Sequence, residues 1–332
     1  MNKMKTKVLA LMLIVIMALT GCATEEANVK INSDGSGIYH VNVTIDEEAY
    51  IDTTLKIYKA AGMTNEEIKA TEKLLRTEAA SSFKEMGAKE VTIDGRKCYQ
   101  ITETANVKPG QMTKTCIGEE QGYITPDTFY YRANVAKMVG EAFGESMGTG
   151  ADASEMEAMF SAAGVDMGDL MKVTISIEFP KPVISTVNGV VDASNKNKVS
   201  FKLNLKDSKT LFATTNSQVT LAGAAAKYKA DNTIKKPSIK ALRANKVSKR
   251  AKKATALLKI RKVTGAKKYE VQYSRKASFK GAKKKTIKKT TYKLTKLRKG
   301  SKYYVRVRAV KYNMGGKVIT SKWAKKSVKT KK

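Results

Sequence analysis

The chain has 332 residues and a formal net charge of +33, which is spread very unevenly along it. Residues 235–332 contain 37 lysines and arginines against one acid, Glu270, whereas residues 23–234 contain 23 basic and 29 acidic residues. This length corresponds to about two average domains, and such asymmetry indicates two modules with different surroundings. The single histidine, His40, excludes a zinc site built from several histidines.

The N-terminal residues have the features of an export signal. Lys3, Lys5 and Lys7 give a cationic start, and residues 8–19 form an apolar run of about a dozen residues, the length of a signal-peptide core. A transmembrane helix needs about 20 apolar residues. We therefore assign residues 1–21 to a signal peptide rather than to a membrane span.

Leu19, Thr20, Gly21 and Cys22 follow in sequence. These residues resemble the lipobox of bacterial lipoproteins, in which a branched apolar residue and two small residues precede the cysteine that becomes the new N-terminus. The resemblance implies a covalent diacylglyceryl lipid on Cys22, no other cofactor, and an exported protein anchored to the outer face of the cytoplasmic membrane. Two acyl chains anchor far better than one. An ordinary secretory signal with an incidental cysteine is the alternative.

Residues 22–230 are predicted to form the first domain, which starts with strands and continues with helices. Alternating apolar residues on both sides of the turn sequence SDGSG predict a hairpin over residues 27–46. Residues 47–61 have helical spacing. A second helix starts at Thr64, which forms a capping box with Glu67, and it ends at Gly87.

The remainder of this domain adds strands around a Met-rich helical region at residues 135–171. Strands are predicted at residues 90–95, 97–107, 172–179, 182–193 and 199–205. Strands at both ends with helices between them predict an α+β domain with a mainly antiparallel sheet.

Cys98 and Cys116 remain once Cys22 carries lipid. Both lie in apparent strands on either side of a Lys-Pro-Gly turn at residues 108–110, so a cross-strand disulfide is a plausible pairing in an exported protein. Closing this loop would stabilise the fold by about 3 kcal/mol. Two free thiols are the alternative, because the sequence does not show whether the Cβ atoms meet.

Two stretches of the first domain, VKINSDGSG at residues 29–37 and residues 173–203 with their proline and Asn-Gly turn, resemble the LppM-type lipoprotein domain of Gram-positive bacteria. The resemblance implies an envelope-facing domain, with lipid or glycolipid binding proposed for one member, and it carries over no binding residue. A carrier or sensor with an adaptable apolar pocket is therefore the alternative function. The methionines that could line such a pocket are Met138, Met147, Met156, Met159, Met167 and Met171, although such residues are more often core.

Candidate chemistry is sparse. Ser146 has the G-x-S-x-G spacing of a nucleophile elbow, but the acid and histidine should follow it and His40 precedes it. Asn32, Asp34 and Ser36 imitate the start of a calcium loop, yet Val43 stands where the bidentate glutamate is needed, so a hairpin turn explains them better. We expect a non-catalytic protein without a metal site.

Residues 231–332 are predicted to hold a linker and an all-β domain. Alternating apolar residues give about seven short strands in under 100 residues, as in an immunoglobulin-like sandwich. The sequence LRKGSKYYVRVRAV at residues 297–310 resembles strand F of a fibronectin type III domain. The resemblance makes Tyr303 the corner tyrosine, whose hydroxyl bonds to backbone a few residues upstream. Ile260 stands where the family has its core tryptophan.

The lysine blocks of this domain are predicted to bind a polyanion, because like charges repel one another until they meet one. The expected partners are anionic wall polymer such as teichoic acid, or anionic lipid. Specific nucleic-acid recognition is not expected, because no recognition helix is apparent. A solvated surface without a partner is the alternative, and the oligomeric state stays open. The candidate binding residues are Lys283, Lys284, Lys285, Lys288, Lys289, Lys325, Lys326 and Lys329.

Overall fold

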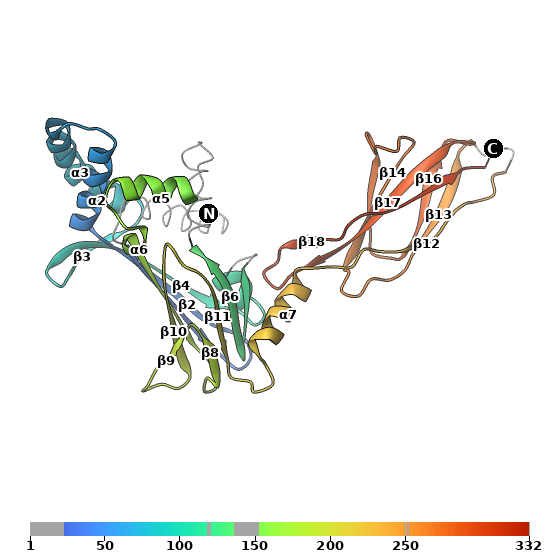
Figure 1. Ribbon diagram of the computed structural model, residues 1–332. Coiled ribbons are helices and arrows are strands. Elements are labelled where there is room, and N and C mark those ends of the chain that lie inside the picture. The colour runs from blue at the N-terminus through green and yellow to red at the C-terminus, as the bar shows by residue number, and fades with distance from the viewer. Residues whose placement is uncertain (1–22, 118–120, 136–152, 249, 251, 332) are drawn as a thin grey trace. The chain divides into compact units, whose positions relative to one another are not determined.

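The computed structural model describes residues 23–117, 121–135, 153–248, 250 and 252–331. The chain divides at Leu221 into two compact units, whose elements Figure 1 shows. The N-terminal unit mixes helices and sheets, and the C-terminal unit is a β-sandwich. Cys22, the expected lipid site, lies outside the described residues. Within them, no helix is both long enough and apolar enough to cross a membrane.

Two sheets form the N-terminal unit, and all neighbouring strands are antiparallel except β1 and β7. The predicted mainly antiparallel sheet is confirmed. The larger sheet has seven strands in the order β3 (Lys89–Ile93), β4 (Arg96–Val107), β2 (Gly37–Asp46), β1 (Ala23–Ile31), β7 (Met171–Glu178), β10 (Lys198–Asn204) and β9 (Val190–Val191). The smaller has the order β5 (Gly122–Thr125), β6 (Thr128–Asn134), β11 (Ser208–Thr214) and β8 (Ser185–Val187).

Local capping fixes the first hairpin and the long helices as predicted. In the β1–β2 turn the Asp34 carboxylate accepts hydrogen bonds from the backbone N and hydroxyl of Ser36, at 2.8 and 2.6 Å. The Thr64 hydroxyl accepts from the backbone N of Glu67, whose carboxylate accepts from the backbone N of Thr64. The helices are α2 (Glu47–Ala60), α3 (Asn65–Glu85), η1 (Thr113–Ile117), α5 (Ala153–Ala162) and α6 (Met167–Leu170).

The inner face of the seven-stranded sheet is covered in two parts. Helices cover one part, where the rings of Phe83 and Tyr99 lie 4.9 Å apart. The smaller sheet covers the other, where Phe129 lies 5.2 Å from Phe201. Val173 contacts both clusters, so the two apolar cores meet near it.

Glu25 lies on this inner face. It is paired with Val43 on β2 and Val173 on β7, and its neighbours Ala23 and Ala27 on the same face are buried. Burial raises the pKa of the Glu25 carboxyl from 4.5 to about 7. The sheet therefore carries an acid at a position that its alternation assigns to the core.

We predict that Glu25→Gln removes part of the pH dependence of stability. Between pH 4.5 and about 7 the folded carboxyl holds a proton that the unfolded one has lost. The free energy of unfolding therefore falls as pH rises through this window, and the loss is complete above it. Denaturant unfolding at pH values across the window should show a flatter profile for Glu25→Gln than for wild type. Glu26→Gln, a change on the exposed neighbour, is the control; parallel profiles for Glu25→Gln and wild type would contradict the prediction.

The two internal cysteines are not joined by a disulfide, and the strand predicted around Cys116 is wrong. Cys98 lies in β4 opposite Asp46, whereas Cys116 lies in η1. Cys116 and Tyr39 pack against the same core cluster, and the β4 partner of Tyr39 is Ala105. Seven residues of strand separate Ala105 from Cys98, about 23 Å. A disulfide requires Cα atoms within about 7 Å.

The strand predicted over residues 182–193 is divided between the two sheets. β8 pairs with β11 in the smaller sheet and β9 with β10 in the larger one. Asn188 and Gly189 join them: Asn188 has a φ of 60°, and a Cβ on Gly189 would lie 2.5 Å from the Phe201 ring. Alternating sequence alone could not show this change of sheet, because both segments keep the strand pattern.

The described residues of the C-terminal unit form eight strands, where the sequence predicts about seven. One sheet has the order β12 (Ile239–Ala244), β13 (Ala254–Ile260) and β16 (Thr291–Leu297). The other has the order β15 (Lys283–Ile287), β14 (Lys268–Ser274), β17 (Lys302–Tyr312) and β18 (Val318–Thr320), with β19 (Ala324–Lys329) also paired to β17. β18 and β19 both pair with β17, and residues 321–323 separate them. In this interruption the Ser321 hydroxyl accepts a hydrogen bond from the backbone N of Ala309 at 3.0 Å.

Helix α7 (Leu221–Asp231) belongs to this unit from Ala222 onward. The Lys311 ammonium donates to the carbonyl of Ala230 at 2.7 Å. The backbone N of Met314 donates to the Asp231 carboxylate, also at 2.7 Å. The β17–β18 hairpin thus holds the C-terminal end of α7.

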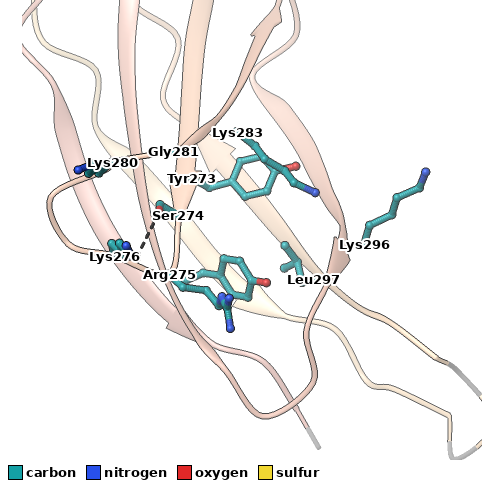
Figure 2. A pocket seen from close by; sticks show the side chains of 10 residues that line it. Tyr273, Ser274, Arg275, Lys276, Lys280, Gly281, Lys283, Lys296 and Leu297 are labelled. Carbon is teal, nitrogen blue, oxygen red and sulfur yellow. Dashed lines mark hydrogen bonds between the residues drawn. The ribbon is translucent and has the colours of Figure 1, made fainter.

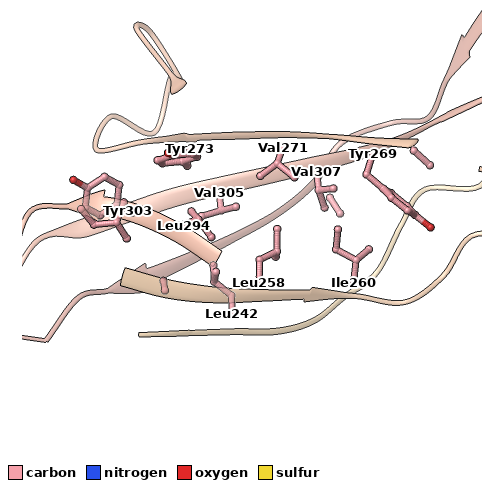
Figure 3. Packing of buried hydrophobic residues seen from close by; sticks show 14 of the residues in the cluster. Leu242, Leu258, Ile260, Tyr269, Val271, Tyr273, Leu294, Tyr303, Val305 and Val307 are labelled. Atoms are coloured by element: carbon pink, nitrogen blue, oxygen red, sulfur yellow. The ribbon is translucent and has the colours of Figure 1, made fainter. Parts of the chain in front are cut away.

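The sandwich core and its corner tyrosine agree with the predicted pattern. Figure 3 shows Leu258 and Ile260 of one sheet opposite Val271 and Val307 of the other. Ile260, at the position of the expected tryptophan, is buried among them. The Tyr303 hydroxyl accepts a hydrogen bond from the backbone N of Arg298 at 3.0 Å, which confirms the corner.

Tyr303→Phe should lower the free energy of unfolding of the C-terminal unit by about 1 kcal/mol, because it removes one hydrogen bond to a partly buried backbone group and little apolar area. Denaturant unfolding measures the change. Tyr304→Phe, at the next and outward-facing residue, should change it much less. Equal effects of the two substitutions would show that the hydrogen bond of the Tyr303 hydroxyl does not stabilise the unit.

Candidate anion-binding site

A pocket of about 320 Å³ lies at one end of the sandwich. Figure 2 shows its side chains, which come from the ends of β14 and β16, the start of β17, the start of β15 and the β14–β15 connection. The lining residues are Tyr273, Ser274, Arg275, Lys276, Lys280, Gly281, Lys283, Lys296, Leu297 and Tyr303. Five of the ten are cationic and none is acidic.

The apolar part of the lining belongs to the sandwich core. Tyr273, Leu297 and Tyr303 are buried members of that core cluster. Burial, and next the neighbouring Tyr292, raise the pKa of the Tyr273 hydroxyl, which therefore stays protonated at neutral pH. The pocket thus has a neutral, partly aromatic wall beneath charged groups.

A bulge in β16 contains Lys296, which lines the edge of the pocket. Ala254 pairs with Leu297 and Ala256 with Leu294, so β16 has one residue more than β13 between these pairs. Lys296 accommodates the extra residue with a φ of 56°, which is uncommon outside glycine. Bulges often re-aim a side chain in this way.

Backbone contacts shape the β14–β15 connection, which carries three of the cations. The Ser274 hydroxyl accepts from the backbone N of Lys276 at 3.1 Å. Phe279 has a φ of 60°, a strained value for a bulky residue, and its ring lies 4.4 Å from the Arg306 guanidinium. Packing against β17 therefore holds the loop in a conformation that the chain would not adopt alone.

In the described part of residues 222–332, no carboxylate forms an ion pair with a pocket cation. Residues 222–332 contain only two acids, Asp231 and Glu270. Glu270 forms an ion pair with Arg308 at 2.7 Å, and Asp231 accepts from the backbone of Met314. Because repulsion among like charges is relieved by an external anion, the lining suits a phosphate or carboxylate group.

The eight lysines predicted from the sequence are exposed, but they do not form one cluster. Lys283 lines the pocket; Lys284 and Lys285 follow it on β15, an edge strand, and Lys288 and Lys289 lie in the next turn. The other three lie on β19. β14 and β17 separate the two groups by about 14 Å, three strand spacings of about 4.8 Å. The members on β19 are Lys325, Lys326 and Lys329.

Sequence reasoning missed four of the five pocket cations. Arg275, Lys276 and Lys280 occupy a turn whose sequence, SRKASFKG, contains no lysine block. Lys296 reaches the pocket through a bulge that depends on strand pairing. The one sequence feature that could have indicated these residues is the density of basic residues between two predicted strands.

The methionine-pocket alternative gains no lining residue from the described side chains. Met167 and Met171 are buried in the helix-covered core. Met138 and Met147 lie outside the described residues, as do the side chains of Met156 and Met159. The serine of the G-x-S-x-G sequence, Ser146, also lies outside them.

Residues 261–322 match the family model of the fibronectin type III domain. That segment contains every residue that lines the pocket. Fibronectin type III domains are generally non-catalytic binding or scaffold modules. No curated protein matches the chain.

Several solved structures are similar to parts of the chain. A Fn3-like protein from Clostridium thermocellum is 27% identical, with 30% of this chain and 96% of that chain covered and a TM-score of 0.23. The fn3 domain of human collagen alpha-1(XX) chain is 22% identical, with coverages of 35% and 94% and a TM-score of 0.23. The folded domain of Mycobacterium tuberculosis LppM is 12% identical, with coverages of 62% and 95% and a TM-score of 0.31.

We predict that Lys283→Gln raises the melting temperature of the C-terminal unit by about 1–3 °C at low salt, because it relieves repulsion in the pocket. The gain should shrink as salt screens the remaining charges. Scanning calorimetry across a salt series measures both effects. Lys259→Gln, on the outer face of the other sheet, is the matched control; an equal gain there would mean that total charge rather than the pocket is responsible.

Proposed function

We propose that this chain is an exported, lipid-anchored envelope protein whose C-terminal unit binds anionic wall polymer. The observation that carries the proposal is the pocket of five cations without a carboxylate. Anchoring through a lipid on Cys22 would place the unit outside the cytoplasmic membrane of a Gram-positive cell. Teichoic acid, with repeated phosphates, is the partner that this charge distribution favours.

Three features of the pocket support a phosphate rather than an apolar ligand. Five of the residues that line its hollow of about 320 Å³ are cationic, so an anionic group that enters it meets positive charge. The neutral hydroxyl of Tyr273 remains a hydrogen-bond donor at neutral pH. The lysines on β15 and β19 lie on strands flanking β14 and β17, where further phosphates of a polymer can bind.

Anionic lipid offers the same phosphate chemistry as the polymer. Each basic residue near an anionic membrane contributes about 1 kcal/mol. The chemistry of the pocket therefore does not distinguish wall polymer from anionic lipid. The experiment must include anionic vesicles for this reason. A lipid or glycolipid carrier function in the N-terminal unit stays a prediction.

The test is co-sedimentation of the full-length chain, in mild detergent, with purified cell wall. Wall with and without teichoic acid and anionic vesicles are compared from about 50 to about 300 mM NaCl. Binding that needs teichoic acid and weakens at least about tenfold over this series supports the proposal, since a polyanion releases counterions on binding. No binding at low salt contradicts it, and binding to vesicles alone assigns the site to lipid.

Two triple variants separate the pocket from total charge. Lys280→Gln, Lys283→Gln and Lys296→Gln together remove three pocket cations. Lys240→Gln, Lys259→Gln and Lys293→Gln remove the same charge from exposed positions on the other sheet. We expect the first triple to weaken binding by about tenfold more than the second. Equal losses would show a diffuse charge effect without a site.

A further inference from the structure

The two apolar cores pack on the inner face of the seven-stranded sheet. The opposite, outer face of this sheet is polar. Strand alternation produces it: Ala27, Val29 and Ile31 point to the core, so Asn28 and Lys30 point outward. The same alternation on β2, β4, β7 and β10 places threonine, serine, asparagine and glutamine beside them. We call this surface the polar face.

Short side chains form one row across the polar face. Residues directly opposite one another on paired strands share a face, so the register aligns Ser200, Ser176, Asn28, His40 and Thr104. Within the row, the hydroxyls of Ser176 and Ser200 are 2.9 Å apart, and His40 Nδ1 is 2.8 Å from the Thr104 hydroxyl. Four of the five side chains are thus paired by hydrogen bonds within the row.

The adjacent row has longer side chains, and the difference in length leaves a hollow. Lys198, Glu178, Lys30 and Ile38 are paired across the sheet in the same manner. The hollow has a volume of about 310 Å³, within the size of known small-molecule sites. Its lining residues are Asn28, Val29, Lys30, Ile38, His40, Ser176, Glu178 and Lys198.

The charge of this hollow differs from that of the basic pocket. Lys30 and Glu178 form an ion pair at 3.2 Å, so the charge that remains in the lining is that of Lys198. The carboxylate of Glu178 also opposes a phosphate ligand. What the lining offers instead is a mixture of donors and acceptors, namely the amide of Asn28, the imidazole of His40 and the hydroxyl of Ser176.

An apolar group lies beside these polar groups. Ile38 is 43% exposed, although it is a large hydrophobic residue in a regular strand. A ligand that carries both hydroxyl groups and a C–H surface can use both parts of the lining. A protein strand is less suitable, because strand addition requires a sheet edge and the hollow lies over central strands.

We propose that the hollow on the polar face binds an uncharged oligosaccharide. Sugar hydroxyls would donate to and accept from Asn28, His40 and Ser176, and a ring face would pack on Ile38. Neighbouring sugar units would follow the row of short side chains across β7 and β10. This binding is independent of the basic pocket, since the two lie in different units.

The test is isothermal titration calorimetry of the full-length chain, in mild detergent, with two tetrasaccharides. Chitotetraose carries acetamido groups and maltotetraose carries only hydroxyls, so the pair also shows which kind of sugar is preferred. We expect one of them to bind with a dissociation constant between about 10 μM and about 1 mM. This constant should not change when NaCl is raised, because the ligand has no charge. Failure of both to bind overturns the proposal.

Variants locate the binding on the sheet. Asn28→Ala removes a polar group of the hollow and Ser176→Leu fills it; each should weaken binding by about tenfold. Asn106→Ala, the same change outside the hollow on the polar face, should alter it less than about twofold. If Ser176→Leu lowers the unfolding temperature, its loss of binding can come from a damaged fold. The effect of Asn28→Ala on binding is then the test of the proposal. Binding that Asn28→Ala leaves unchanged would also overturn the proposal.

Discussion

Residues 222–332 have to fold while carrying a large excess of positive charge and only two acids. Their sandwich meets this constraint by placing long cationic side chains where aromatic or neutral polar groups receive them. The Arg306 guanidinium lies 4.4 Å from the Phe279 ring and 4.5 Å from the Trp323 ring, and it donates to the amide oxygen of Gln272. Cation–π contacts and neutral acceptors replace the counterions that the sequence lacks. Glu270 pairs with Arg308 beside this stack, and the pocket is consequently left without an acid.

The N-terminal unit is subject to a different constraint. Its larger sheet packs against two apolar cores on one face and is exposed to solvent on the other. Helices and a second sheet share its inner face, and they meet where Glu25 and Val173 are paired. Its outer face keeps small polar residues in register across several strands. The two candidate sites of the chain thus differ in kind. The basic pocket consists of loops and strand ends, whereas the hollow on the polar face consists of strand interiors.

Residue patterns determine alternation, capping and turn chemistry, and these parts of the fold could be predicted from the sequence. The Tyr303 corner, the burial of Ile260 and the Thr64 cap depend on spacing within short segments. What could not be predicted depends on pairing between distant segments. Cys116 lies in η1 rather than in a strand, so the pair of strands on which the possible disulfide depended is not present. The basic pocket depends on the bulge at Lys296 and on Phe279 against Arg306, neither of which leaves a pattern in the chain.

Strand β15 is an edge strand with three consecutive lysines, Lys283, Lys284 and Lys285. An unpaired edge is a template on which a second chain can add a strand, and lysine is a common means of preventing it. Copies of this chain held close together would therefore keep their sandwiches apart by mutual repulsion along β15. An anion that neutralises these lysines removes that protection. Binding of the proposed polyanion would therefore act on edge-to-edge aggregation through Lys283, which lines the pocket and also begins β15.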